Sequence, residues 1–410
     1  MNPSVRTLAA LILAMALAVI LVPAGGLGLA PLAGIFVFLS LPLKPVRDAV
    51  RQPGAALALS ALAIAWFCLT FIWSGYDQLD ELWKLALLTP LFMMVPLAAG
   101  QIAPHHLHLA RAALVFAVFA IFLVLGAESL TRGDMTLSYK LSVENFSVER
   151  NDLQIAVERG LSRGATPALM MGGIVAIMLW HTSNRILRGL AAGLAVIAVI
   201  IATDYNVYAN AVAFVAAAGV CALAARWPRQ VAAGLFHAIA VILIFTPLIF
   251  TALLALPDAQ LRPLMPMSWE WRLEIWQYAL GRIGEQPVFG HGLGAARVID
   301  ATNELRGFQI DLLPLHAHNA GMTIWLETGA TGALLAGGAL IAIGRAVARM
   351  TLSRPAALMV CWAVTIWFVN VTLSYGVWQE WHHAALAFAI AMTILARPAP
   401  VPAGNLLHPR

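Results

Sequence analysis

A short polar run before an apolar segment holds two of the chain's 11 histidines, and it reads His316-Ala317-His318-Asn319. An imidazole titrates near neutral pH, so either histidine could act as a general base or orient a substrate. Asn319 could instead cap the following helix, with both histidines merely solvated. A His-x-His pair can also chelate zinc, although no third ligand lies nearby in the sequence. The residues alone leave these three interpretations open.

Three cations stand where they could hold an anion. Arg272 could clamp a phosphate through its bidentate fork, or it could equally bind lipid headgroups. Arg163 lies between Gly160 and Gly164, whose small size would let a ligand approach closely. Lys84 begins an apolar run, where a lysine often only snorkels to the headgroups. The sequence therefore indicates an anion site, with ordinary membrane contacts as the alternative.

Two further features lie close to the histidines in the sequence. Glu327 follows His318 by nine residues inside an apolar run, and a carboxylate there usually faces the protein interior and has a partner. It is either structural or tunes the site. The run Gly290–Gly294 has the glycine spacing of a phosphate-cradling loop, but no βαβ unit surrounds it. We expect a turn, whose amides could still form an anion nest.

The elements that position these residues must lie in lipid. Of the 410 residues, 61% are hydrophobic and 11% are charged, whereas a soluble domain carries about 25% charged residues. Because backbone groups find no water in the bilayer core, apolar runs of about 17–25 residues predict helices and not barrel strands. The net charge of +5 does not indicate nucleic acid, since the basic residues are dispersed over short loops. The three cysteines lie in apolar runs, where packing is the expected role.

The expected fold is all-α, a single transmembrane bundle over residues 1–410 with about twelve spans. We place the helices at 7–23, 26–41, 54–73, 83–99, 107–126, 164–180, 188–203, 207–225, 231–256, 319–343, 356–375 and 383–396. Two long loops remain, at 127–163 and 257–318. Long loops are usually functional. The second should contain an interfacial helix from Ser268, its expected N-cap, to Gly284.

Loop charge sets the expected orientation. With both termini cytoplasmic, 14 of the 25 Lys and Arg residues fall on the cytoplasmic side or at its border, with Asp48 as the one acidic residue among 20. Both long loops then face the periplasm. Short basic loops are typical of the cytoplasmic side, so this orientation is favoured and the candidate site is periplasmic.

The motifs together resemble the signature of the O-antigen ligase and polymerase superfamily. The resemblance covers about residues 270–332 and rests on four runs in this order: Trp271–Trp276, Glu285–Gly294, Leu315–Asn319 and Glu327–Gly332. It implies a bacterial inner-membrane glycosyltransferase of the GT-C type. Such enzymes take a glycan from an undecaprenyl-pyrophosphate carrier. Ligases pass it to a lipid A-core sugar, and polymerases pass it to another carrier-bound repeat unit.

The resemblance also implies roles for particular residues. Arg272 matches the family arginine, and His318 matches the histidine before the motif asparagine. Lys84 and Arg163 match by position. The family often has a Ser-Arg pair at a later helix start, whereas residues 203–210 here lack an arginine. Arg163, with Arg297 as a second candidate, is the substitute that we expect to bind pyrophosphate.

These observations predict an O-antigen ligase with His318 and His316 as catalytic candidates. Arg272, Arg163, Lys84 and Arg297 would bind the donor, and Asn319 and Glu327 would support the site. No cofactor or metal is expected, and the partners are the carrier-linked glycan, lipid A-core and membrane lipids. A polymerase with the same donor is the alternative. A transporter is disfavoured because no internal repeat is evident and the charges avoid the middle of the spans.

Overall fold

The computed structural model describes residues 2–142, 150–204, 208–255 and 262–396, and these are helical apart from turns and one hairpin. The helices of the first half are α1 Pro3–Leu21, α2 Leu29–Ser40, α3 Leu43–Arg51, α4 Ala55–Thr70, α5 Asp80–Trp83, α6 Thr89–Ala99, α7 Leu107–Thr131, α8 Asp134–Ser142 and α9 Arg150–Trp180. Those of the second half are α10 Arg185–Asp204, α11 Tyr208–Arg226, α12 Pro228–Ile244, α13 Thr246–Leu254, α14 Met267–Glu285, α15 Ala320–Arg349, α16 Arg354–Leu373 and α17 Glu380–Ala396. The strands β1 Thr302–Leu305 and β2 Phe308–Asp311 pair antiparallel.

The all-α membrane fold is confirmed. Within the described residues, nine helices are long and apolar enough to cross a membrane, and two bent pairs raise the count to eleven. Every predicted span coincides with a helix or a bent pair. The predicted total of twelve requires that α17, with 17 residues, also crosses.

Two spans differ from their predictions where the backbone bends. The predicted helix 231–256 is divided into α12 and α13, which meet at 68°. Pro247 at the start of α13 has no N–H to donate, and the Leu243 carbonyl one turn before it instead accepts the Trp325 indole N–H at 2.9 Å. Ahead of α6, residues Lys84–Leu88 form a π-helical turn, so this span begins at Asp80 and not at 83.

The first long loop was predicted wrongly as a loop. Helix α7 continues to Thr131, α8 follows, and α9 already begins at Arg150. Val157 and Leu161 are almost fully buried, so their packing extends α9 well before the predicted start at 164. Arg163 therefore lies inside α9 and does not open a helix.

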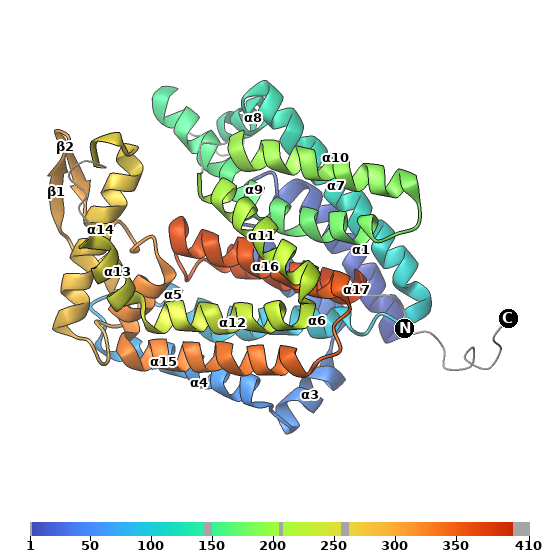
Figure 1. Cartoon of the computed structure of the whole chain (residues 1–410), viewed down its shortest axis with the longest axis horizontal. Coiled ribbons are helices and arrows are strands. Elements are labelled where there is room, and N and C mark those ends of the chain that lie inside the picture. Colours follow the sequence, from blue (N-terminus) through green and yellow to red (C-terminus); the bar gives the residue numbers. More distant parts are fainter. Residues whose placement is uncertain (1, 143–149, 205–207, 256–261, 397–410) are drawn as a thin grey trace.

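The molecule has two distinct ends along its long axis (Figure 1). One end, which we call the hairpin end, carries α14 and the β1–β2 hairpin; the N-terminus lies toward the other. At that other end, Ser4 bonds His106 at 2.9 Å and Arg111 bonds the Leu395 carbonyl at 3.0 Å. The predicted site residues can now be located at the hairpin end.

Candidate active site

Helix α14 holds the backbone between the two histidines. The Trp276 indole N–H donates to the Ala317 carbonyl at 3.1 Å, and both residues are buried. Ile275 and Ala279 pack with Ala317 in the same apolar cluster. The predicted helix is confirmed, but its N-cap is Pro266 and Ser268 lies within the first turn. The apolar stripe of α14 thus fixes the position of the histidine run.

Asn319 caps α15, as one interpretation of the run predicted. Its backbone is extended, with φ −155°, and its Oδ1 accepts the Met322 N–H at 3.0 Å. His318 just before it has φ 49°, a left-handed conformation that costs a non-glycine residue about 1–3 kcal/mol. The surrounding contacts therefore hold His318 in a conformation that it would not adopt alone.

The two imidazoles are held in opposite tautomers. His318 Nδ1 lies 2.9 Å from the Ser374 carbonyl, which can only accept, so Nδ1 carries the proton. His316 Nδ1 accepts the His318 backbone N–H at 3.1 Å, so a neutral His316 carries its proton on Nε2. Neither Nε2 makes a hydrogen bond within the described chain, and neither is sealed from solvent. His318 therefore offers a lone pair, and His316 offers an N–H.

Burial keeps both rings neutral. It lowers the pKa of His316 to about 3, with the charges of His318, Arg297 and Arg272 acting in the same direction. Burial also lowers the pKa of His318, partly opposed by the bond to Ser374, and the charge of Arg272 adds to the lowering. The two imidazole rings lie edge to face, with their centroids 4.2 Å apart. The charges of Arg272 and Arg297 thus disfavour a proton on the histidine pair.

The segment joining α16 to α17, residues Ser374–Gln379, completes the surroundings and was not predicted as part of the site. Ser374 accepts from His318, and Gly376 lies so close that a Cβ there would sit 2.9 Å from His316 Cδ2. The Tyr375 hydroxyl donates to the Ser162 carbonyl at 3.2 Å on α9. Sequence reasoning missed this segment, because no local pattern shows which segment packs against a distant histidine.

Glu327 has the interior partners that its position predicted. One carboxylate oxygen, Oε2, accepts the Gly294 N–H at 3.0 Å and the Trp378 indole N–H at 2.6 Å. The turn interpretation of Gly290–Gly294 is confirmed, since all three glycines have positive φ. The amides of His291 and Gly292 donate to the α15 carbonyls of Leu326 and Glu327. The anion held by this turn is therefore the protein's own carboxylate.

Arg272 and Arg163 have no carboxylate partner among the described residues. Arg272 donates to the Ser268 carbonyl at 2.9 Å and lies over the Trp269 ring, 5.4 Å from its centroid. Its Nε is buried without a partner, and burial lowers the pKa of its guanidinium. Arg163 is half-buried, and its charge partly opposes the rise that burial imposes on the pKa of Tyr375. Both cations could therefore accept an outside anion.

Of the two glycines beside Arg163, Gly164 is required by a close backbone contact and Gly160 is not. A Cβ on Gly164 would lie 2.2 Å from the Val22 carbonyl, and one on Gly160 would meet Thr136 at 3.9 Å. Gly164 thus admits the backbone at the end of α1, and not a ligand. The region compared with the family's Ser-Arg pair, residues 203–210, falls partly outside the described chain, although Asn210 bonds Thr166 at 2.9 Å on α9.

Lys84 and Arg297 are placed differently, because carboxylates already surround them. Lys84 Nζ lies 3.5 Å from Asp80, 3.6 Å from Glu81 and 3.9 Å from Glu380. Arg297 forms an ion pair with the same Glu81. The four predicted cations thus divide into an unpaired set and a paired set.

Two other sequence expectations concern metals and cysteines. Within the described ranges, no three His, Cys, Asp or Glu side chains come together in an arrangement that could hold a metal ion. The three cysteines are free, as their positions in apolar runs predicted.

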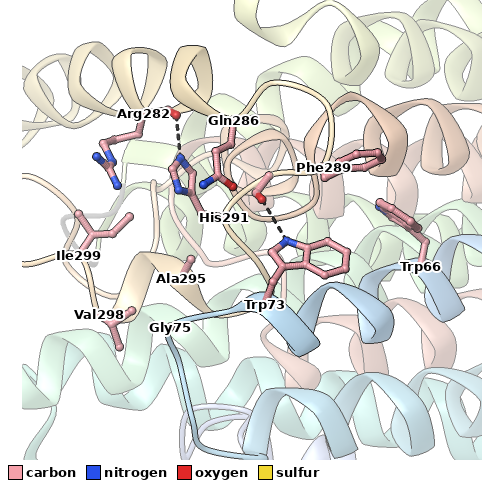
Figure 2. A pocket seen from close by; sticks show the side chains of 11 residues that line it. Trp66, Trp73, Gly75, Arg282, Gln286, Phe289, His291, Ala295, Val298 and Ile299 are labelled. Atoms are coloured by element: carbon pink, nitrogen blue, oxygen red, sulfur yellow. Dashed lines mark hydrogen bonds between the residues drawn. The ribbon is translucent and has the colours of Figure 1, made fainter.

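A cavity of about 800 Å³ opens beside the glycine turn (Figure 2). Trp73 contributes to its wall and donates its indole N–H to the Gly290 carbonyl at 3.1 Å, and His291 bonds the Arg282 carbonyl at 2.8 Å. Trp66 and Phe289 add aromatic surface. None of the predicted site residues lines this cavity, so it neighbours the histidine site without containing it.

Fold and site define a multi-pass membrane protein with a histidine- and arginine-bearing site at one end of its bundle. A family model described as O-antigen ligase matches residues 208–337, which include both histidines and Glu327 but neither Lys84 nor Arg163. This match agrees with the resemblance of the ordered motifs to the O-antigen ligase and polymerase superfamily.

Three bacterial proteins are similar to part of the chain. Proteins named "Putative polysaccharide ligase" from Rickettsia conorii, Rickettsia typhi and Rickettsia prowazekii are each 26% identical over 132 residues. The aligned part is 31% of this chain and 32% of each relative. The chain therefore spans about a third of the length of the curated relatives that it matches.

Proposed function

We propose that this protein is an O-antigen ligase that transfers a glycan from undecaprenyl pyrophosphate to a sugar of lipid A-core. The reaction takes place at the hairpin end, on the periplasmic face of the bacterial inner membrane. The observation that carries the proposal is the state of His318. Its Nδ1 proton is committed to Ser374, and its neutral Nε2 is accessible to a substrate. The match to the O-antigen ligase family model supports the class of reaction, and this geometry supplies a base for it.

The proposed step is a displacement at the anomeric carbon of the donor sugar. His318 Nε2 takes the proton of the acceptor hydroxyl, whose oxygen forms the new bond to the anomeric carbon. The bond from that carbon to the pyrophosphate oxygen breaks, and the pyrophosphate leaves with the electron pair. His316 Nε2–H can donate a hydrogen bond to a substrate oxygen beside it. The sugar-pyrophosphate bond supplies the driving force, so no nucleotide is needed.

Arg272 and Arg163 are the proposed ligands of the leaving pyrophosphate. Charge grows on its oxygens as the bond breaks, and cations already in place stabilise that charge without reorganising. Both arginines lack a carboxylate partner in the described chain, so neither must give up an ion pair to bind it. The planar fork of arginine also suits two phosphate oxygens at once.

The test is transfer by the purified, reconstituted protein. Carrier-linked glycan and lipid A-core are mixed with the wild type or with His318→Ala in the presence of a chelator, and the products are separated on a gel. We expect glycan on lipid A-core with the wild type and a loss of about 10²–10⁴-fold in rate with His318→Ala. His181→Ala is the matched control, because His181 is an exposed histidine at the end of α9.

The proposed role of Arg272 is tested with a second pair of matched variants. Arg226 lies over the Trp227 ring at 5.6 Å, much as Arg272 lies over Trp269, but on α11. Arg272→Ala should raise the KM for donor, and Arg226→Ala should not. Normal transfer by well-folded His318→Ala would refute the proposed base. Lengthening of the carrier-linked glycan without lipid A-core product would identify a polymerase.

A further inference from the structure

A mixed-charge network lies beside the histidine pair and contains two of the predicted donor ligands. It consists of Asp80, Glu81, Lys84, Arg297 and Glu380, which we call the Lys84 network. Lys84 Nζ lies within 4 Å of all three carboxylates, and Arg297 pairs with Glu81. Three carboxylates and two cations leave one negative charge in excess when all five groups are ionised. The network is therefore not a basic patch, although it holds two cations.

Four members of the network can be reached from outside. The side chains of Asp80, Glu380, Lys84 and Arg297 are 35%, 29%, 21% and 30% exposed. Glu81 is 2% exposed, and its Oε2 is buried without a hydrogen-bond partner. Such an orphaned acceptor costs free energy unless a donor reaches it. The network thus combines an open polar rim with an unsatisfied acceptor beneath it.

The aromatic ring of Tyr76 borders the Lys84 network. The Tyr76 hydroxyl donates to Asp80 at 2.7 Å, and Arg297 lies over the Tyr76 ring, 5.7 Å from its centroid. Burial raises the pKa of Tyr76 to about 12, so this hydroxyl keeps its proton. Glu380 begins α17 four residues after Gly376, which packs against His316, so the network lies close to the histidine pair.

These charges disfavour a pyrophosphate and favour a sugar. An anion bound at Lys84 would face three carboxylates within about 4 Å of the same ammonium and would have to displace them. A sugar hydroxyl both donates and accepts a hydrogen bond. It can donate to a carboxylate and accept from Lys84 or Arg297 without changing the net charge. The unpaired Arg272 and Arg163 meet no such obstacle with an anion.

We propose that the Lys84 network binds the acceptor sugar through its hydroxyl groups, and that pyrophosphate binding is left to Arg272 and Arg163. This inference rests on the proposed function, and it assigns the two substrates to different groups of side chains around the histidine pair. Lys84 and Arg297 then serve the acceptor and not the donor. The acceptor hydroxyl is held where His318 Nε2 can take its proton.

Two-substrate kinetics test this assignment. Initial rates are measured with donor and acceptor varied independently, for the wild type, Glu380→Gln, Lys84→Gln and Arg272→Ala. We expect Glu380→Gln and Lys84→Gln to raise the KM for acceptor about tenfold, through loss of hydrogen bonds to charged groups, and to leave the KM for donor within about twofold. Arg272→Ala should show the reverse pattern.

A matched carboxylate separates binding from a general effect of charge. Glu274 pairs with Arg262 at 2.6 Å on α14, away from the Lys84 network, so Glu274→Gln should leave both KM values unchanged. A raised KM for donor in Lys84→Gln or Glu380→Gln, with an unchanged KM for acceptor, would overturn this inference and leave the proposed function intact. A wild type that forms no product with lipid A-core or with a second carrier-linked glycan would instead overturn the proposed function.

Discussion

The carboxylate of Glu327 joins three segments, and its removal should weaken the whole hairpin end. In Glu327→Leu, the Gly294 N–H and the Trp378 indole N–H lose their acceptor while remaining largely buried. A buried donor without a partner costs about 1–3 kcal/mol, so the two together predict a loss of about 2–6 kcal/mol in the free energy of unfolding. Leucine has a similar volume, so this loss contains little cavity energy.

Glutamine is the control for the charge of Glu327. Both bonds use Oε2, and the single amide oxygen of Glu327→Gln can take its place. Neutral hydrogen bonds are roughly half as strong as charge-assisted ones, so Glu327→Gln should lose about half as much as Glu327→Leu or less. Denaturant unfolding of the detergent-solubilised protein, followed by near-ultraviolet circular dichroism, measures both losses.

A double-mutant cycle isolates the bond to Trp378. Trp378→Phe removes the indole N–H and keeps an aromatic ring against Phe67, whose ring centroid lies 5.3 Å away. The loss in the double variant with Glu327→Leu should be smaller than the sum of the single losses by about 0.5–3 kcal/mol. Strict additivity, or a Glu327→Leu variant as stable as the wild type, would refute the reasoning.

Three further predictions concern pH and the backbone. Because its pKa is lowered from the ordinary value of 6.5, His318 should stay neutral below pH 6.5. The acid limb of the kcat/KM profile should therefore lie below pH 6.5, and a limb above that pH would contradict the burial of the ring. The folded pKa of His316 is about 3, so the unfolded chain binds more protons below pH 6.5, and the thermal midpoint should fall as the pH drops from 6.5 toward 3. His316→Asn supplies an acceptor without titrating and should flatten that fall. Gly329→Ala should abolish folding or transfer, because the φ of 65° is strained for alanine and its Cβ would lie 2.3 Å from the Val288 carbonyl. Gly234→Ala is the control and should fold normally, because open space surrounds Gly234.

The position of each span was readable from composition because the bilayer imposes one demand on every segment. An apolar run of about 20 residues must be a helix wherever it lies, since no other local structure satisfies its backbone in lipid. The errors arise in polar segments, where lipid imposes no such demand, and at bends within a span. The start of α9 lies in a polar stretch that becomes helical through the packing of Val157 and Leu161, and the bend at Phe245 depends on a single proline.

The site was readable only in its local parts. The cap at Asn319, helix α14 and the glycine turn follow from residue type and short spacing, and all three are present. The partners that a charged group meets across the bundle did not follow, because the spacing along the chain indicates only neighbours on the same helix. Lys84 meets Glu380 from a helix almost 300 residues later, whereas Arg272 meets no carboxylate in the described chain.

The sequence by itself determined the membrane fold, the helical segments and the residue types available at the hairpin end, because lipid solvation and local backbone chemistry act on short stretches. Only the tertiary structure decided which histidine nitrogen is free and which cations are already neutralised. Those properties depend on Ser374 beside His318, Glu380 beside Lys84 and Glu81 beside Arg297, and folding brings each pair together from distant segments. Hydrogen bonds and ion pairs act over a few ångströms in space, whatever the separation along the chain.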